Sequence, residues 1–165
     1  MKAHFERFAR YNRWANRRLY AAVARLDSAA FNAPRSGFFP SIAKTLNHIL
    51  VGDRVWMSRF DSAPLEHKAL DEIPYPEFAA LDAAREAEDQ RIIRYARALT
   101  EDRIVAALQF RTMAGEAKTM SLDIALAHFF NHQTHHRGQA HAMLSGTAVP
   151  PPAIDLLYFV AEDAG

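Results

Sequence analysis

The chain has no cysteine among its 165 residues. Disulfide bonds, a thiolate nucleophile and zinc sites with cysteine ligands are therefore excluded. Excess charge is also nearly absent, because 20 Lys and Arg residues stand against 19 Asp and Glu residues and give a net charge of +1. Such a chain has no overall field to attract nucleic acid or an anionic membrane. We therefore expect neither of these as a partner.

Long apolar segments are missing as well. No apolar run approaches the roughly 18 residues of a membrane-spanning helix, and the opening stretch MKAHFERFARYNRW lacks the apolar core of a signal peptide. These absences predict a cytoplasmic protein. Half of the residues are hydrophobic and 24% are charged, which is ordinary for a globular protein. The length fits one domain, expected to span residues 1–165.

Apolar residues recur every three or four positions in four long segments, which predicts four helices. Ser41 is the expected N-cap of the second helix and Ser121 that of the fourth. Pro76 suits the first turn of the third, and Gly146 follows the end of the fourth. The expected ranges are 3–26, 42–60, 76 to about 99, and 121 to about 144.

The segment between the third and fourth helices has a different pattern. VAALQFRT and GEAKTM predict two short strands of a hairpin, with Gly115 at the turn. The prolines of AVPPPAI prevent the fourth helix from continuing, and a last short helix is expected at 153–162. Four long helices in one domain predict an all-α fold, a four-helix bundle with a short β-hairpin insertion before the fourth long helix.

Histidine is concentrated in the fourth helix. Four of the eight histidines fall in FNHQTHHRGQAH, residues 130–141, and a fifth precedes this stretch. On a helical wheel, His128, His132 and His136 share a face with large apolar residues, so we predict that this face points inward. The other two histidines lie at its edge or point away from it: His135 and His141.

His132 and His136 have the spacing of a metal-binding pair, because histidines four residues apart project their rings to one side of a helix. A single inward histidine is more often a hydrogen-bonded core residue. A stack of buried imidazoles has few partners, and a metal ion supplies a common one. The only histidine in the middle of another helix is His48, in TLNHILVGDRVW. It lies well off the centre of the apolar side, so periodicity leaves its role open.

Three stretches carry a resemblance to a known family. YNRWANRRLY, TLNHILVGDRVW and HFFNHQTHHRGQAHAML resemble segments that occur in this order, at similar separations, in the DinB/YfiT-like family. The resemblance covers nearly the whole chain, including the tail PPPAIDLLYFV. It implies an up-down four-helix bundle, often a homodimer, with a divalent metal ion, most often nickel or zinc. The ligands that it implies are His48, His132 and His136.

Three histidines with no fourth protein ligand leave a position for water or substrate, as in reactive metal centres. Characterised relatives in this family include enzymes that use small thiols. The resemblance therefore implies a metal-dependent enzyme on a small molecule, of the thiol-dependent transferase or hydrolase type, with a low-molecular-weight thiol as a possible co-substrate. The alternative is a metal-binding stress-response protein without turnover.

Charged residues on the apolar side of the third helix allow two interpretations. Arg85, Glu88 and Asp89 fall on or beside this side. They fit ion pairs in which the aliphatic parts of the side chains pack over the core. They also fit the wall of a cleft above the metal, with Glu88 as a base or as a hydrogen-bond acceptor for a ligand.

Asp53 lies five residues after His48 and is open to the same two interpretations. It fits a catalytic base, or an ion pair with Arg54 or Arg59. An acid or base near the open metal position would separate an enzyme from a binding protein. Glu88 and Asp53 are the candidates.

Trp14 lies among arginines, off the apolar stripe of the first helix. Such an aromatic can stack on nucleic-acid bases, but the balanced charge argues against this. We expect another part of the chain or a second subunit to cover it. Arg137 is expected to be structural, and His67 to lie on the surface.

Overall fold

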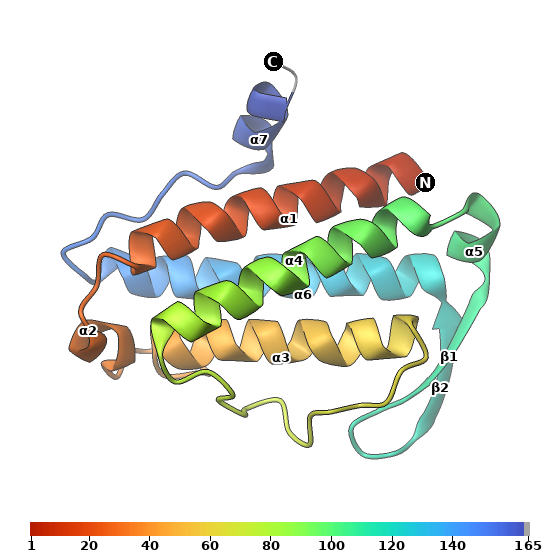
Figure 1. Ribbon diagram of the computed structural model, residues 1–165, viewed down its shortest axis with the longest axis horizontal. Helices are drawn as coiled ribbons and strands as arrows, with labels where there is room; N and C mark the ends of the chain where they lie inside the picture. The colour runs from red at the N-terminus through yellow and green to blue at the C-terminus, as the bar shows by residue number, and fades with distance from the viewer. Residues whose placement is uncertain (164–165) are drawn as a thin grey trace.

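The computed structural model describes residues 1–163 and shows four long helices packed side by side (Figure 1). Helices α1 and α4 pack against each other, as do α3 and α6, and these two pairs are joined by contacts of α1 with α6 and of α3 with α4. The predicted four-helix bundle is confirmed. The long helices are α1 (Lys2–Val23), α3 (Ile42–Phe60), α4 (Phe78–Ala98) and α6 (Leu122–Ser145).

The up-down order that the family resemblance implied is wrong in one respect, because the alternation of helix directions is broken once. In Figure 1, α3 and α4 both run from left to right, whereas α1 and α6 run from right to left. Contacts between the two helices agree with this parallel direction. Asp53 of α3 pairs with Arg85 of α4, and Phe60 near the end of α3 stacks on Tyr95 near the end of α4. The crossover is made by residues 61–77, which return along the outside of the bundle. This long loop contributes side chains to two hollows described below.

Two short helices were not anticipated from periodicity, because five residues are too few to show it. They are α2 (Ser28–Asn32) and α5 (Glu101–Val105). Asp27 Oδ1 caps α2 by accepting a hydrogen bond from the Ala30 N–H at 2.7 Å. The first long helix ends at Val23 and not at the predicted residue 26.

The hairpin is formed by β1 (Ala107–Arg111) and β2 (Ala117–Ser121), paired antiparallel with Ala107 opposite Ser121. Gly115 adopts φ +85°, which favours glycine, so the predicted turn residue is confirmed. Ser121 stands at the N-cap position of α6, although its side chain makes no capping hydrogen bond. The last helix is α7 (Leu156–Asp163).

A layer of buried charged and amide groups crosses the middle of the bundle. Nη1 of Arg85 donates to Oδ2 of Asp53 at 2.6 Å, and its Nη2 lies 3.1 Å from Oδ1 of Asp89. Arg137 on α6 donates to the side-chain oxygen of Asn12 on α1. The structural role predicted for Arg137 is confirmed, as is the ion-pair interpretation of Arg85. The partner of Asp53, however, comes from α4 and is not one of the neighbouring arginines of α3.

The C-terminal segment covers Trp14, as one of the two sequence-based alternatives predicted. Phe159 on α7 lies 5.8 Å from its ring, and Nε1 of Trp14 donates to Glu162 at 2.7 Å. This packing fixes α7 against α1. Among residues 1–163, no helix is both long and apolar enough to cross a membrane.

Candidate metal centre

Three histidines bring one ring nitrogen each to a common point between α3 and α6. Nε2 of His48 lies 3.3 Å from Nε2 of His132 and 3.2 Å from Nε2 of His136. The three ligand atoms all lie within 4.8 Å of one another. Two nitrogens bound at about 2.0–2.1 Å to one tetrahedral ion would be about 3.3–3.4 Å apart. The group could therefore hold a metal ion.

Hydrogen bonds on the far side of two rings determine which nitrogen faces this point. Nδ1 of His48 donates to the carbonyl of Leu70 at 2.8 Å, and Nδ1 of His136 donates to Oε1 of Gln139 at 2.8 Å. A neutral imidazole carries one N–H, so both Nε2 atoms present lone pairs to each other. A cation between them removes this repulsion. Metal-bound histidines typically make such hydrogen bonds with their other nitrogen.

The histidine side of α6 is not its inward side, which corrects the prediction from the wheel. Gln133 and Arg137 are buried, whereas His132 and His136 are only partly buried and His128 is exposed. The buried side is centred on the residue that follows each histidine. The two candidate ligands consequently lie at the boundary between the core and solvent. A molecule from solvent can reach a site at this boundary.

An open hollow of about 430 Å³ lies over the three ring nitrogens. Its walls are largely apolar and come from Phe38, Phe39 and Leu70. The ring of Phe39 stacks on His48 with centroids 3.9 Å apart and an interplanar angle of 20°, which fixes the orientation of this imidazole. Asp71, which is exposed, is the carboxylate that lines the same hollow.

A model of the DinB family matches residues 1–163. The chain belongs to the DinB family. "Protein DinB" of Bacillus subtilis (strain 168) is 25% identical over 160 residues, which cover 92% of each chain. The crystal structure of a DinB-like protein from Bacillus cereus ATCC 10987 superimposes with a TM-score of 0.66 over 85% of this chain and 90% of that one. At 15% identity, the latter match shows a shared fold alone. The family resemblance read from the three motifs is confirmed.

In this DinB-family chain, a glycine of α3 makes room for a histidine of α6. A Cβ atom at Gly52 would lie 2.9 Å from Cε1 of His132, well inside the optimal separation of about 3.5–4.0 Å for carbon atoms. Gly52 follows His48 by one helical turn. The same stretch of α3 thus supplies one candidate ligand and the space for another.

We expect Gly52→Ala to weaken metal binding by about 10-fold or more, because the added methyl group displaces the ring of His132. The helix itself should not suffer, since alanine favours helix by about 1 kcal/mol over glycine. Gly138→Ala on α6 is the matched control, because a Cβ there meets nothing within 4 Å. Competition titration of the metal would measure both variants. Equal affinities would contradict the steric argument.

The two carboxylates proposed as catalytic candidates lie elsewhere. Asp53 is fully buried and paired with Arg85. Glu88 lies 3.2 Å from Arg91 and 3.6 Å from Arg54, and it lines a different hollow. The expectation that Glu88 lines the cleft above the histidines is therefore wrong, and the catalytic role of both residues stays a prediction without support from this geometry.

Asp71 was missed by the sequence analysis, because no periodicity places a residue of loop 61–77 against α3. The preceding residue gives the structural reason for its position. The carbonyl of Leu70 accepts the hydrogen bond of His48, and this contact brings the next side chain to the hollow. No signal in the sequence marked that contact.

Burial keeps the candidate ligands neutral. It lowers the pKa of His48 and of His136, and with the added repulsion of His136 and His48 it lowers the pKa of His132 to about 3. Deprotonated imidazoles are the form that binds metal. At pH 7 the three rings are thus ready to act as ligands.

The metal-free protein should lose stability in acid through His132. Its pKa is about 6.5 in the unfolded chain and about 3 in the folded one. The unfolded state therefore binds more protons below pH ~6.5, and the stabilisation present above that pH declines towards pH ~3. We expect Tm of the chelator-treated protein to fall more steeply between pH 7.5 and 5 than Tm of His132→Gln. The other titrating groups are the same in both proteins, so their contributions to the pH dependence of Tm cancel in this comparison. Parallel curves would refute the expectation.

Proposed function

We propose that His48, His132 and His136 bind one divalent metal ion, nickel or zinc, and that the protein is a metal-dependent enzyme acting on a small molecule. The observation that carries the proposal is the convergence of three Nε2 atoms on the floor of an open hollow. Within residues 1–163, the group of candidate ligands around this point has no fourth member. Structural zinc sites are almost always closed by four protein ligands, whereas catalytic sites use three.

The residues around the histidines support chemistry at this point. A bound ion supplies Lewis acidity and lowers the pKa of water or a thiol that occupies its open position. Phe38, Phe39 and Leu70 offer apolar walls to the organic part of a substrate. Asp71 lines the hollow and is the candidate to accept a proton from the attacking group.

The reaction class that we propose is a thiol-dependent transfer or a hydrolysis, with a low-molecular-weight thiol as co-substrate in the first case. The proposal includes a cytoplasmic location, a homodimer, and neither nucleic acid nor a membrane as partner. The alternative is a non-catalytic metal-binding stress-response protein. The two functions differ in whether the metal exchanges a ligand and whether the hollow takes part in turnover.

Ligand exchange can be observed on the cobalt-substituted protein. We expect azide or a small thiol to change its visible spectrum, because three histidines leave at least one position of the ion to solvent. Asp71→Asn and Glu88→Gln should both retain this change, since neither residue belongs to the ligand group. A spectrum unaffected by these additions would favour the non-catalytic alternative.

Turnover should distinguish the two carboxylates. In a screen of small thiols with electrophiles and of hydrolysable esters and amides, Asp71→Asn should lower kcat by about 100-fold, the lower end of the effect of general acid–base catalysis. Glu88→Gln, whose side chain lines the other hollow, should leave kcat within a few-fold of the parent value. The opposite ranking would restore Glu88 as the candidate base.

A further inference from the structure

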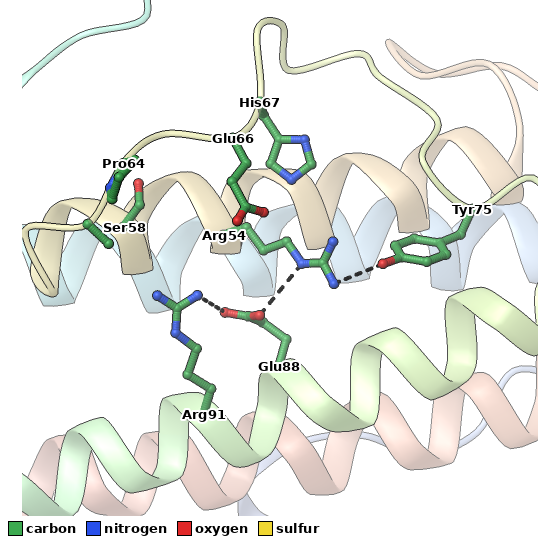
Figure 2. Close-up of a pocket in the computed structure, with 9 residues that line it drawn as sticks. Arg54, Ser58, Pro64, Glu66, His67, Tyr75, Glu88 and Arg91 are labelled. Carbon is green, nitrogen blue, oxygen red and sulfur yellow. Dashed lines mark hydrogen bonds and ion pairs between the residues drawn. The ribbon is translucent and has the colours of Figure 1, made fainter.

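A second hollow, of about 440 Å³, lies between α3, α4 and loop 61–77 (Figure 2). It shares no lining residue with the hollow over the histidines. Its volume falls within the range of about 300–1,000 Å³ that is usual for small-molecule sites. The polar side chains that line it include Arg54, Ser58, Glu66, His67, Glu88 and Arg91.

His67 lines this hollow and carries a buried ring nitrogen that has no hydrogen-bond partner among residues 1–163. Only 9% of the residue is exposed, so the prediction that it lies on the surface is wrong. Its Nδ1 lies 2.7 Å from Oε2 of Glu72. Hydrogen bonds from His67 and from the backbone N–H groups of Lys68 and Ala69 lower the pKa of Glu72 to about 2. Glu72 is thus ionised and can only accept, so Nδ1 of His67 carries the proton.

The other ring nitrogen of His67 has no partner. In the neutral ring, Nε2 holds a lone pair, and it makes no hydrogen bond to any of residues 1–163. Figure 2 shows the ring projecting from the loop into the hollow. Buried polar atoms are rarely left unpaired in folded proteins. The partner that the neutral ring lacks is a hydrogen-bond donor.

The charged side chains that line the hollow differ in how well their hydrogen-bonding groups are paired. Arg91 has two carboxylate partners, at 2.7 Å from Asp61 and 3.2 Å from Glu88. Arg54 donates to the hydroxyl of Tyr75 at 3.1 Å, but its nearest carboxylate oxygen, on Glu88, is 3.6 Å away. Its Nη1 has no hydrogen-bond partner in the described chain. This guanidinium can therefore bind the carboxylate group of a ligand.

Glu66 complements Arg54 with the opposite charge. It lines the same hollow and makes no hydrogen bond or ion pair with any residue up to 163. In Figure 2 its carboxylate, the ring of His67 and the guanidinium of Arg54 gather in the middle of the hollow. An unpaired ring nitrogen, an anion and a cation thus line the same hollow.

We propose that this hollow binds a small zwitterion of the amino-acid type. The ligand carboxylate lies on Arg54, and its ammonium group donates to Glu66 and to Nε2 of His67. A simple anion would leave His67 without a donor and would meet the carboxylates of Glu66 and Glu88. A simple amine would leave Arg54 without an anion. Only a molecule with both groups satisfies all three side chains.

This site is independent of the proposed metal chemistry, so it is tested on both the metal-free and the metal-loaded protein. The probes are L-norvaline, pentanoate, which lacks the ammonium group, and butylamine, which lacks the carboxylate. Binding is followed by NMR through the imidazole resonances of His67, assigned with His67→Gln. We expect saturable shifts with norvaline and at least about 10-fold weaker binding of the other two compounds.

Variants test the assigned contacts. Arg54→Gln and Glu66→Gln should each weaken norvaline binding by about 10-fold or more. Arg94→Gln, an exposed residue of α4 outside the hollow, is the matched control and should bind as the parent does. Glu66 is exposed, so its replacement tests the site even if Arg54→Gln folds poorly. Equal binding of pentanoate or butylamine, or no shift at the highest soluble norvaline concentration, would overturn the proposal.

Discussion

Replacing His132 or His136 with alanine is expected to remove most of the bound metal. Each change deletes one of three converging nitrogens. Loss of an outer hydrogen-bond partner of a metal ligand typically costs about 10–100-fold in affinity, so loss of the ligand itself should exceed about 100-fold. Elemental analysis of protein purified without a nickel affinity column, followed by competition titration with a chelator, would measure the effect.

The same helix offers two control histidines. His135 is exposed, and its Nε2 accepts a hydrogen bond from the amide of Gln139 at 3.1 Å. His141 donates from Nε2 to the carbonyl of Pro152 at 2.9 Å. His135→Ala and His141→Ala should therefore keep the parent metal content. The same metal content in all four variants would show that the assignment of the ligands is wrong.

Arg85→Ala should be the most destabilising single change in the core. It leaves the carboxylates of Asp53 and Asp89, which are 0% and 1% exposed, without the cation between them. Breaking a buried pair in this way costs about 3–5 kcal/mol. Urea denaturation would give the change in the free energy of unfolding. Arg13→Ala, which breaks an ion pair with Glu86 at the surface between α1 and α4, should cost no more than about 1 kcal/mol.

A compensated variant separates charge from packing. Arg85→Met combined with Asp53→Asn and Asp89→Asn removes the cation together with both anions. The triple variant leaves no unpaired charge in the core, so it should be more stable than Arg85→Ala. If Arg85→Ala costs no more than Arg13→Ala, the buried network does not contribute as its geometry indicates.

The four long helices, the last short helix and the hairpin could be predicted from the sequence because their signals are local. The spacing of apolar residues, Ser41 before α3, Gly115 at the turn and Gly146 after α6 act over a few positions of the chain. The i, i+4 spacing of His132 and His136 follows from helix geometry in the same way. The family could be predicted too, because its motifs are short and occur in a fixed order.

The rotation of α6 and the path of loop 61–77 could not be predicted, because both depend on contacts between distant residues. The core turns Gln133 and Arg137 inward, so the histidines face the edge of the bundle, and Glu88 lines a different hollow. His48 lies beside His132 and His136 because α3 packs antiparallel to α6. The sequence by itself determined which long helices form and which of them carry imidazoles. Only the tertiary structure decided which groups meet at the candidate metal centre, including Asp71. The reason is that side-chain packing across the whole bundle sets the rotation of each helix and the position of the loop.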